Sequence, residues 1–212
     1  RSDGTLFVTA GERHQGAPAQ DLGGTLGKII RINADGTIPD DNPFVRQPGA
    51  KAEIWSLGHR NPYGLFFDAA GRLWENEMGP AGGDELNVLT AGANYGWPLV
   101  SNGQGYDGSD IPDHKAGDGF AAPALSWTPV IAPAGMIIYS GTRFENWQGN
   151  AIVAGLQSKG LVRVRLDGAS ATEVERIDLG MRIRAIAQGP NGAIWVLEDR
   201  PSARLIRLDP VF

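Results

Sequence analysis

The sequence contains no cysteine, which excludes disulfide bridges and metal sites built from thiolates. Oxygen atoms are therefore the expected metal ligands. It also contains no apolar run of about 18 residues, so it predicts no transmembrane helix. The 19 basic and 24 acidic residues give a formal net charge of −5, and they are interspersed rather than gathered in a basic patch. This pattern does not favour nucleic acid or an anionic membrane as a partner.

Motifs of several common enzyme classes are also missing. There is no Gly-x-Ser-x-Gly elbow, phosphate-binding loop or dinucleotide fingerprint, so serine hydrolysis and nucleotide cofactors have no support. The three histidines, His14, His59 and His114, are not spaced as metal ligands, and a hydrogen-bonded structural role is the simpler interpretation of His59. The chain starts RSDGTLFVT, without an initiator methionine or a signal-like apolar segment. We interpret it as a mature or truncated product whose true beginning lies upstream.

Glycine and proline are abundant, at 30 and 14 residues, and long helical patterns are few. This composition predicts many short strands joined by tight turns, with few helices. The expected strands are short runs rich in β-branched or aromatic residues: 6–9, 28–33, 53–57, 64–68, 73–77, 136–140, 151–155, 161–166, 184–188, 193–198 and 204–208.

A weak internal repeat links these runs. SDGTLFVTAG, AAGRLWENEMG and GPNGAIWVLED each place a turn before a strand with an aromatic residue, and GKIIRINADG, GLVRVRLDG and RLIRLDP each place a basic alternating strand before a turn. Such recurrence favours a β-propeller over a β-sandwich, which also repeats short strands. We expect an all-β chain with a single propeller domain over residues 1–212 and about four blades, the first incomplete. The acidic, glycine-rich residues 101–123 are expected to form a long loop excursion.

The segment WENEMGPAGGDELN, residues 74–87, sets a glycine-rich loop between acidic residues. Carbonyl groups at Gly79 and Pro80, with the nearby Asp84 and Glu85, suit calcium, a hard cation that accepts carbonyl and carboxylate oxygens. The alternative is an acidic turn that faces solvent. From these residues alone the solvent-facing turn is the simpler interpretation.

Two further motifs carry arginine. In GHRNPYG, Arg60 and Asn61 place a fork of donors beside an amide, which suits a planar carboxylate or quinone-like ligand. The alternative is a buried arginine bonded to carbonyl groups at a blade corner. In MRIRAI, alternation with period two puts Arg182 and Arg184 on one strand face, where they could clamp a polyanion. A solvated strand face is the usual explanation of such a pair.

Five segments in this order form the most specific pattern in the chain: 4–45, 53–65 (EIWSLGHRNPYGL), 76–98 (NEMGPAGGDELNVLTAGANYGWP), 127–136 (WTPVIAPAGM) and 181–199. Together they resemble the soluble aldose sugar dehydrogenases of the glucose/sorbosone dehydrogenase family, which use pyrroloquinoline quinone (PQQ). The resemblance covers essentially all 212 residues. It implies a six-bladed β-propeller, usually periplasmic or secreted, with PQQ and calcium near the axis. The implied activity is oxidation of aldose sugars at the anomeric carbon.

The resemblance also implies site residues. It assigns calcium ligands to four positions, with Gly79 and Pro80 holding the calcium bound to PQQ, and Glu85 and Tyr95 holding a structural calcium. PQQ is a tricarboxylate, so arginines would neutralise it, and calcium would polarise its reactive carbonyl. Six further residues match cofactor-binding positions: Arg60, Asn61, Asp84, Tyr106, Arg182 and Arg184.

Several positions depart from the family pattern. Tyr63 stands where a glutamine is usual, Met78 where a histidine or glutamine is usual, and Val130 where a small hydroxyl residue is usual. Each change removes a polar group close to the cofactor. A lysine that often approaches PQQ has only Lys159 as a poorly aligned counterpart.

The largest departure is the catalytic base. In the family this base is a histidine just before the strand that here begins at Asp3, so it would lie upstream of Arg1, and no catalytic residue is assigned within the chain. About two of the six blades would be missing as well. We therefore expect this chain alone to be inactive. Self-association, or a separately made N-terminal fragment, would close the propeller.

A different class of function is compatible with the same sequence. The substitutions at Tyr63, Met78 and Val130 would then mark a non-catalytic propeller that has lost its PQQ contacts and binds a sugar or a protein partner. Binding of PQQ distinguishes the two hypotheses. The sequence identifies neither the sugar nor the electron acceptor.

Overall fold

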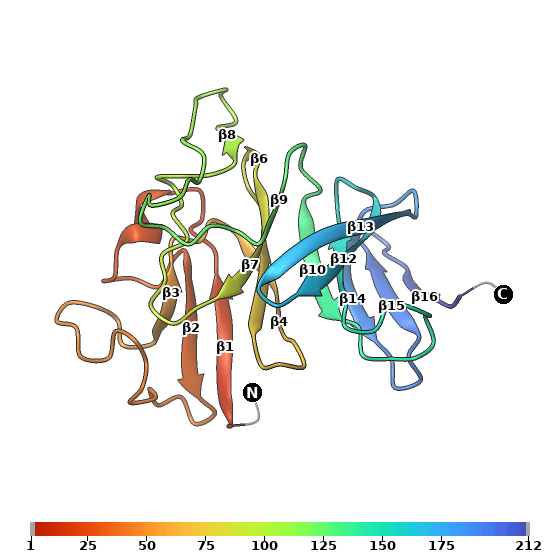
Figure 1. Ribbon diagram of the computed structural model, residues 1–212, viewed down its shortest axis with the longest axis horizontal. Coiled ribbons are helices and arrows are strands. Elements are labelled where there is room, and N and C mark those ends of the chain that lie inside the picture. The colour runs from red at the N-terminus through yellow and green to blue at the C-terminus, as the bar shows by residue number, and fades with distance from the viewer. Residues whose placement is uncertain (1–2, 211–212) are drawn as a thin grey trace.

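The computed structural model describes residues 3–210, which form antiparallel β-sheets and one short 3₁₀ helix, η1 (Ala17–Gln20). Four sheets follow one another along the chain and are called blades 1 to 4 (Figure 1). Blade 1 contains β1 (Thr5–Ala10), β2 (Lys28–Asn33) and β3 (Ile54–Leu57). Blade 2 contains β4 (Pro62–Phe67), β5 (Leu73–Glu77), β7 (Asp84–Leu89) and β9 (Leu125–Trp127).

Blade 3 contains β10 (Pro133–Ile138), β11 (Ala151–Gly155), β12 (Gly160–Asp167) and β13 (Ser170–Asp178). Blade 4 contains β14 (Ile183–Gln188), β15 (Ile194–Glu198) and β16 (Leu205–Leu208). A two-stranded ribbon of β6 (Ala81–Gly82) and β8 (Gly103–Gln104) stands at the upper end of the molecule in Figure 1. Residues 101–123 contain no other strand.

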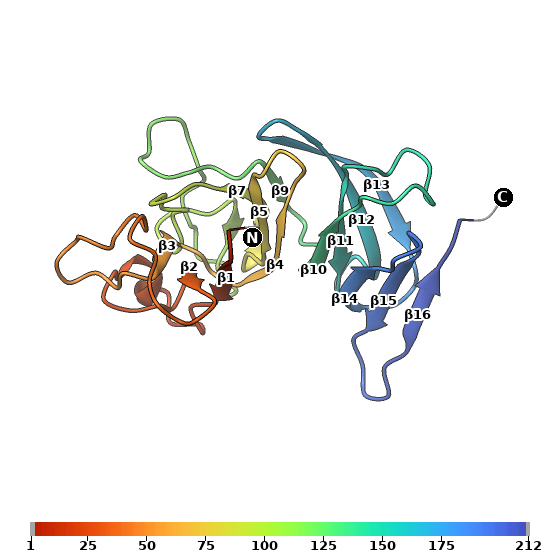
Figure 2. The same cartoon turned by 90° about the horizontal axis from the view of Figure 1, so that it is seen from below.

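The blades are arranged side by side as an open arc around an axis. β4 packs against β10, and β10 packs against β14, so these three strands are the innermost strands of blades 2, 3 and 4. Figure 2 shows the same order from below, with blades 1 and 4 at opposite ends of the arc. The described residues thus form consecutive blades of a propeller without closing the ring.

Each pair of neighbouring blades encloses one cluster of buried apolar side chains. Strand β11 explains how one sheet serves two clusters: Val153 faces blade 2 and Ile152 faces blade 4, and both are fully buried. Because alternate side chains of a strand point to opposite faces, a strand that packs apolar clusters on both faces is apolar throughout, as AIVAG is. Full burial of each such side chain stabilises the fold by about 1.5–3 kcal/mol.

Blade 1 lacks an innermost strand among residues 3–210. The amide of Glu12, which follows β1, donates to the carbonyl of Arg60 at 2.9 Å, just before β4 begins. The end of β1 therefore lies beside the start of β4, so β1 runs opposite to the innermost strands and occupies the second position of its blade. This agrees with the expectation of an incomplete first blade.

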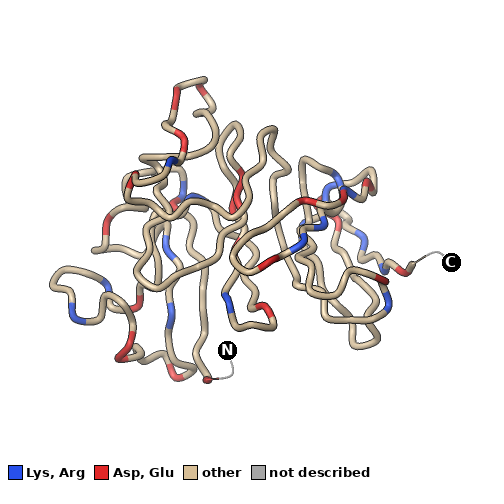
Figure 3. The backbone as a smooth tube through the Cα atoms, in the orientation of Figure 1, with Lys and Arg blue, Asp and Glu red and all other residues tan. Residues whose placement is uncertain are grey.

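Charged residues do not gather on one blade, as Figure 3 shows for the Lys and Arg segments and for the Asp and Glu segments. Over residues 3–210, no helix has the length and apolar character that crossing a membrane requires.

Candidate functional site

The candidate site lies where the innermost strands begin, at the upper end of the molecule in Figure 1. Four segments meet there: the segment after β1, the connection from β3 to β4, the loop after β5, and the long segment around β8. The connection from β3 to β4 turns sharply at Gly58, whose φ of +77° is a conformation that favours glycine. Residues 59–61 follow directly and carry the first group of functional side chains.

Arg60 is buried, with 6% exposure, and its guanidinium is held from several sides. Nη1 donates to the carbonyls of Met78 and Gly79 at 2.8 and 2.9 Å, and Nη2 donates to Oη of Tyr106 at 3.1 Å. The Cζ atom lies 5.3 Å from the ring centroid of Trp97 and 5.4 Å from that of Tyr106. Its buried Nε has no hydrogen-bond partner among the described residues. A buried, oriented guanidinium with a spare donor is suited to an oxygen-rich planar ligand.

A cavity of about 250 Å³ opens beside this guanidinium. The predicted residues Arg60, Asn61 and Tyr106 all line it, together with Met78. Asn61 Nδ2 lies 3.5 Å from Sδ of Met78, so the thioether takes the place of a stronger acceptor. Three residues that the sequence did not single out for this site complete the wall: Glu12, Arg13 and His14.

The segment after β1 brings those three residues to the cavity. Arg13 and His14 have φ values of +63° and +59°, which non-glycine residues seldom adopt. The buried carboxylate of Glu12 accepts hydrogen bonds from the amides of Gln15 and Gly16 and so stabilises this turn. Two consecutive left-handed residues beside a ligand-sized cavity are a backbone strain of the kind found at functional sites.

Asp84 contacts backbone amides rather than the cavity. Its Oδ1 accepts from the amide of Gly79 at 2.9 Å, and its Oδ2 accepts from the amides of Ile131 and Ala132, each at 2.7 Å. Burial raises the pKa of Asp84 to about 6, although these hydrogen bonds and the nearby Arg60 oppose that rise. Asp84 thus fixes the loop that presents the carbonyls of Gly79 and Pro80.

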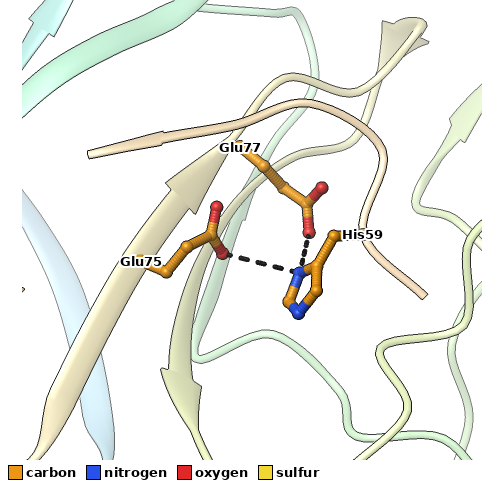
Figure 4. Close-up of side chains that lie close together, drawn as sticks. All are labelled: His59, Glu75 and Glu77. Atoms are coloured by element: carbon orange, nitrogen blue, oxygen red, sulfur yellow. Dashed lines mark hydrogen bonds and ion pairs between the residues drawn. The ribbon is translucent and has the colours of Figure 1, made fainter. Parts of the chain in front are cut away.

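Acidic side chains form a buried cluster on one face of β5 and β7. Glu75 pairs with Asn87 and Glu77 with Glu85 in the antiparallel register, which brings all four to the same face. His59 Nδ1 lies 3.1 Å from Oε1 of Glu77 and 4.0 Å from Oε2 of Glu75, as Figure 4 shows. The other ring nitrogen, Nε2, lies 2.8 Å from Oγ of Ser56. Histidine 59 is therefore fully hydrogen-bonded and buried, in line with the structural role predicted for it.

The three carboxyl groups of this cluster have too few hydrogen-bond donors to be ionised together without a cation. Asn87 Nδ2 is within 3.1 to 3.4 Å of oxygens of Glu75, Glu77 and Glu85. Burial and the charge of Glu77 raise the pKa values of Glu75 and Glu85 well above the ordinary range. Glu75 Oε1 and Asn87 Oδ1 are buried without a partner among the described residues. A cation with oxygen ligands would satisfy these atoms.

A small cavity of about 10 Å³ adjoins Glu77, Glu85 and Tyr95, which is room for about one small ion or water. The hydroxyl of Tyr95 donates to the carbonyl of Val88 at 2.6 Å and accepts from the amide of Thr90 at 3.0 Å. Its ring also stacks on His59, with centroids 4.7 Å apart. Because the phenol is engaged, only the backbone carbonyl of Tyr95 is suited to a metal ion.

The carbonyl of Gly79, predicted to hold a calcium ion, is one of the two that accept a hydrogen bond from Arg60. A carbonyl oxygen has two lone pairs, so this bond leaves one for a cation. Pro80 is buried next to it. The donor set around the cavity therefore fits both an anionic, carbonyl-bearing ligand and a hard cation.

Arg182 and Arg184 meet at one carboxylate. Arg182 donates from Nε and Nη2 to Oδ2 of Asp199 at 2.9 and 2.7 Å, and Arg184 donates from Nε to Oδ1 at 3.0 Å. The β14–β15 register shifts between Ile183 and Ala185, so Arg184 lies at an irregularity of the kind that re-aims a side chain. The two arginines share a partner, as expected from their alternation. Neither lines the cavity next to Arg60.

Comparison with known proteins identifies the family. Residues 1–207 match glucose/sorbosone dehydrogenase. The chain belongs to this family. Aldose sugar dehydrogenase YliI of Escherichia coli strain K12 is 42% identical over 212 residues, which cover 98% of this chain and 57% of the relative.

Solved structures agree with this membership and with the propeller fold predicted from the repeat. Soluble aldose sugar dehydrogenase from Escherichia coli in the apo-form matches with a TM-score of 0.91 at 41% identity, over 96% of this chain and 60% of that chain. The PQQ-bound form of aldose sugar dehydrogenase from Streptomyces coelicolor matches with a TM-score of 0.75 at 29% identity, over 98% of this chain and 59% of that chain. This glucose/sorbosone dehydrogenase chain thus spans less than two thirds of these relatives.

Proposed function

We propose that this chain is part of a PQQ- and calcium-dependent dehydrogenase that oxidises aldose sugars at the anomeric carbon, in the periplasm or outside the cell. The observation that carries the proposal is the convergence of Arg60, Asn61 and Tyr106 on one cavity at the axial end. Membership of the glucose/sorbosone dehydrogenase family supports it, as does the similarity to a PQQ-bound aldose sugar dehydrogenase.

In this proposal the chain's own residues bind and orient. Arg60 and Asn61 would hold the quinone end of PQQ with their N–H donors, and Tyr106 of the long loop would lie beside it. Arg182 and Arg184 would offset the charge of its carboxylates. When bound, PQQ with its calcium supplies the hydride acceptor for the sugar. Asp84 keeps the Gly79 and Pro80 carbonyls in place by holding the backbone of their loop.

We place the proton acceptor for the sugar hydroxyl outside this chain, on a histidine upstream of Arg1. His59 is buried and bonded at both ring nitrogens, which leaves it no access to a sugar. His114 lies close to acidic residues, and the distance from its Nε2 to Oε1 of Glu85 is 3.8 Å. His14 lines the cavity but follows β1, whereas the family's base precedes that strand. General-base catalysis needs a group within hydrogen-bond reach of the proton.

A second cation is proposed at Glu85, with the carbonyl of Tyr95. The buried carboxylates of Glu77 and Glu85 beside a cavity of about 10 Å³ support it, because a divalent cation would offset charge that burial makes costly. This cation would stabilise the pairing of β5 with β7 rather than take part in the reaction.

One set of observations favours a second candidate, a non-catalytic propeller that binds a sugar or a protein. Met78 presents a thioether to Asn61, and Tyr63 is engaged with Arg184 by a hydrogen bond of 3.0 Å. Both side chains stand where the family pattern has polar groups that approach the cofactor. If these changes abolish PQQ binding, the cavity would remain as a binding site without a redox function.

Calorimetric titration of the chain with PQQ, with and without calcium, tests the proposal. We expect micromolar or tighter binding that requires calcium. Arg60→Lys keeps the charge but loses the planar fork, and we expect it to weaken binding about tenfold or more. Arg207→Ala changes an arginine on the outer strand β16 that pairs with Asp209; it is the matched control and should leave binding unchanged.

Turnover separates the role of the chain from that of the whole enzyme. With PQQ, calcium and glucose, the isolated chain should not reduce an artificial electron-acceptor dye, whereas a longer protein that includes the upstream histidine should. Robust turnover by the isolated chain would refute the upstream base. Complete absence of PQQ binding under all conditions would support the non-catalytic candidate instead.

A further inference from the structure

Tyr63 connects two blades that are not neighbours. It lies on β4 of blade 2, and its Oη accepts a hydrogen bond of 3.0 Å from Nη1 of Arg184 on β14 of blade 4. The Cζ atom of Arg184 also lies 5.4 Å from the centroid of the Tyr63 ring. Blade 3 separates the two strands in the sheet order, because β10 packs against both. The contact therefore crosses the axial end of the arc, and Tyr63 follows two residues after Asn61, which lines the cavity.

The bonds of Arg184 fix the direction of its remaining donor. Asp199 accepts from Nε at 3.0 Å and Tyr63 accepts from Nη1, while Nη2 makes no hydrogen bond with any residue in 3–210. A planar guanidinium held at two of its three nitrogens cannot turn without breaking both bonds. One third of the Arg184 side chain is exposed, at 34%, so the free edge is accessible to a ligand.

The charge around this arginine also favours an anion. Asp199 is shared by Arg182 and Arg184, and those bonds hold the pKa of its carboxyl below the ordinary range. Two guanidinium groups and one carboxylate leave one net positive charge. Tyr63 orients Arg184 without neutralising this charge, because a phenol is an uncharged acceptor.

We propose that Tyr63 is a positioning residue that directs the free edge of Arg184 at a carboxylate of the ligand, which under the proposed function is PQQ. Its phenol oxygen is the acceptor for Nη1 of Arg184, and its ring adds a cation–π contact. The substitution at this position thus keeps a polar role and does not by itself argue for loss of the cofactor. This inference rests on the proposed function only in one respect, which is the identity of the ligand.

Three variants divide the role of Tyr63 into its parts. Tyr63→Phe keeps the ring and removes the acceptor, Tyr63→Gln keeps an acceptor and removes the ring, and Tyr63→Ala removes both. Because Tyr63 is 41% exposed, these variants should fold, which circular dichroism and thermal unfolding will verify. Leu99→Ala, at another exposed position with 54% exposure, is the matched control.

The first measurement needs no cofactor. The rate at which phenylglyoxal modifies Arg184, followed by peptide mass spectrometry, reports how firmly the guanidinium is held. We expect about a threefold or greater increase in Tyr63→Phe, more in Tyr63→Ala, and partial restoration in Tyr63→Gln. An unchanged rate in Tyr63→Ala would overturn the positioning role.

The second measurement is PQQ affinity in the presence of calcium, followed by quenching of tryptophan fluorescence. We expect about three- to tenfold weaker binding in Tyr63→Phe, a larger loss in Tyr63→Ala and Arg184→Ala, and no change in Leu99→Ala. Binding that weakens in Arg184→Ala but not in Tyr63→Ala would refute the role of Tyr63. If the unaltered chain binds no PQQ while Arg184 reactivity still rises, the proposed function fails and the positioning role stands.

Discussion

Asp84 ties two segments of the chain together with one carboxylate. It accepts hydrogen bonds from Gly79 in the loop after β5 and from Ile131 and Ala132 before β10. These three backbone amides would otherwise be buried without partners near the axis, where an unmade hydrogen bond costs about 1–3 kcal/mol. The residue therefore acts on the site through the backbone that carries it.

The raised pKa of Asp84 predicts a specific pH dependence of stability. Its folded pKa of about 6 lies above the ordinary value of 3.8, so the folded state binds the proton more tightly than the unfolded state. The stability contributed by protonation is complete below about pH 4 and is lost as the pH rises through about 6, which amounts to about 3 kcal/mol. Urea unfolding of the wild type between about pH 3 and about pH 7 should show this loss.

The variant Asp84→Asn isolates that contribution, because an amide does not titrate. Its free energy of unfolding should fall less than that of the wild type as the pH rises from about 3 to about 7, by about 3 kcal/mol. The exposed Asp167→Asn serves as control and should follow the wild type. Parallel curves for Asp84→Asn and the wild type would show that Asp84 does not titrate in this range.

Single residues were predictable where a motif fixed their surroundings. Arg60 and Asn61 were singled out because their donors are adjacent at a turn, and the structure places both on one cavity. Arg60 also makes the carbonyl contacts of the alternative interpretation. The partners of Glu75 and Glu77 could not be seen without the register of β5 and β7, which places Glu85 and Asn87 opposite them. The sequence does contain a signal for this cluster, because polar residues alternate on both strands. That signal can be interpreted only when the pairing of the two strands is known.

Strand prediction succeeded where apolar residues carry the pattern. Each of the eleven expected strands overlaps an observed one, because burial on one or both faces selects β-branched and aromatic residues. Strand β7 was missed because Gly82 and Gly83 with two acidic residues look like a turn, although its acidic side chains are buried. Strand β13 was missed because it is an edge strand with mostly exposed polar residues. The two- and three-residue strands β6, β8 and β9 are too short for any period.

The connection from β3 to β4 depends on one glycine, and its replacement should disrupt the site. A Cβ at Gly58 would lie 2.6 Å from the amide nitrogen of Gly96 and 2.9 Å from that of Tyr95, and φ is +77°. Backbone atoms cannot move aside as a flexible side chain can. We expect Gly58→Ala to destabilise the fold by more than about 2 kcal/mol, measured by urea unfolding, and, under the proposed function, to weaken PQQ binding.

Gly36→Ala provides the matched control for that substitution. Gly36 has a similar φ of +86°, but a Cβ there would meet nothing within 4 Å. Gly36→Ala should therefore lower the free energy of unfolding by about 1–2 kcal/mol, the strain of a left-handed conformation at a residue with a Cβ atom. It should leave ligand binding unchanged. Equal losses in the two variants would mean that close packing at Gly58 contributes nothing.

The whole molecule is held by contacts between sequential blades. Its three apolar clusters each join one blade to the next, so the order of the blades follows from the order of the repeats. That order was predictable from the sequence. The exposed surfaces at the two ends of the arc were not predictable, because a repeat pattern does not show which faces remain uncovered. The chain spans 57% of YliI and 60% of the matching E. coli structure, so such faces are expected to be covered in proteins of full length.

These uncovered faces predict self-association of the isolated chain. Within residues 3–210, β1 pairs only with β2, which leaves an open strand edge, and Leu6 and Val8 on it are 49% and 43% exposed. At the other end of the arc, Leu197 and Leu205 are 38% and 66% exposed. Open edges and apolar faces favour pairing with another chain. Native mass spectrometry and sedimentation velocity should therefore detect oligomers whose fraction rises with concentration.

Val8→Lys tests whether the open edge of β1 carries this association. A lysine on an edge strand must be desolvated when a second strand pairs with it, so we expect the dissociation constant to rise about tenfold or more. Leu99→Lys places the same charge at an exposed position outside any strand and should leave association unchanged. If association persists in Val8→Lys but is lost in Leu205→Lys, the contact between chains lies on blade 4 rather than on the edge of β1. A wild-type chain that stays monomeric and folded at all concentrations would contradict association through either end.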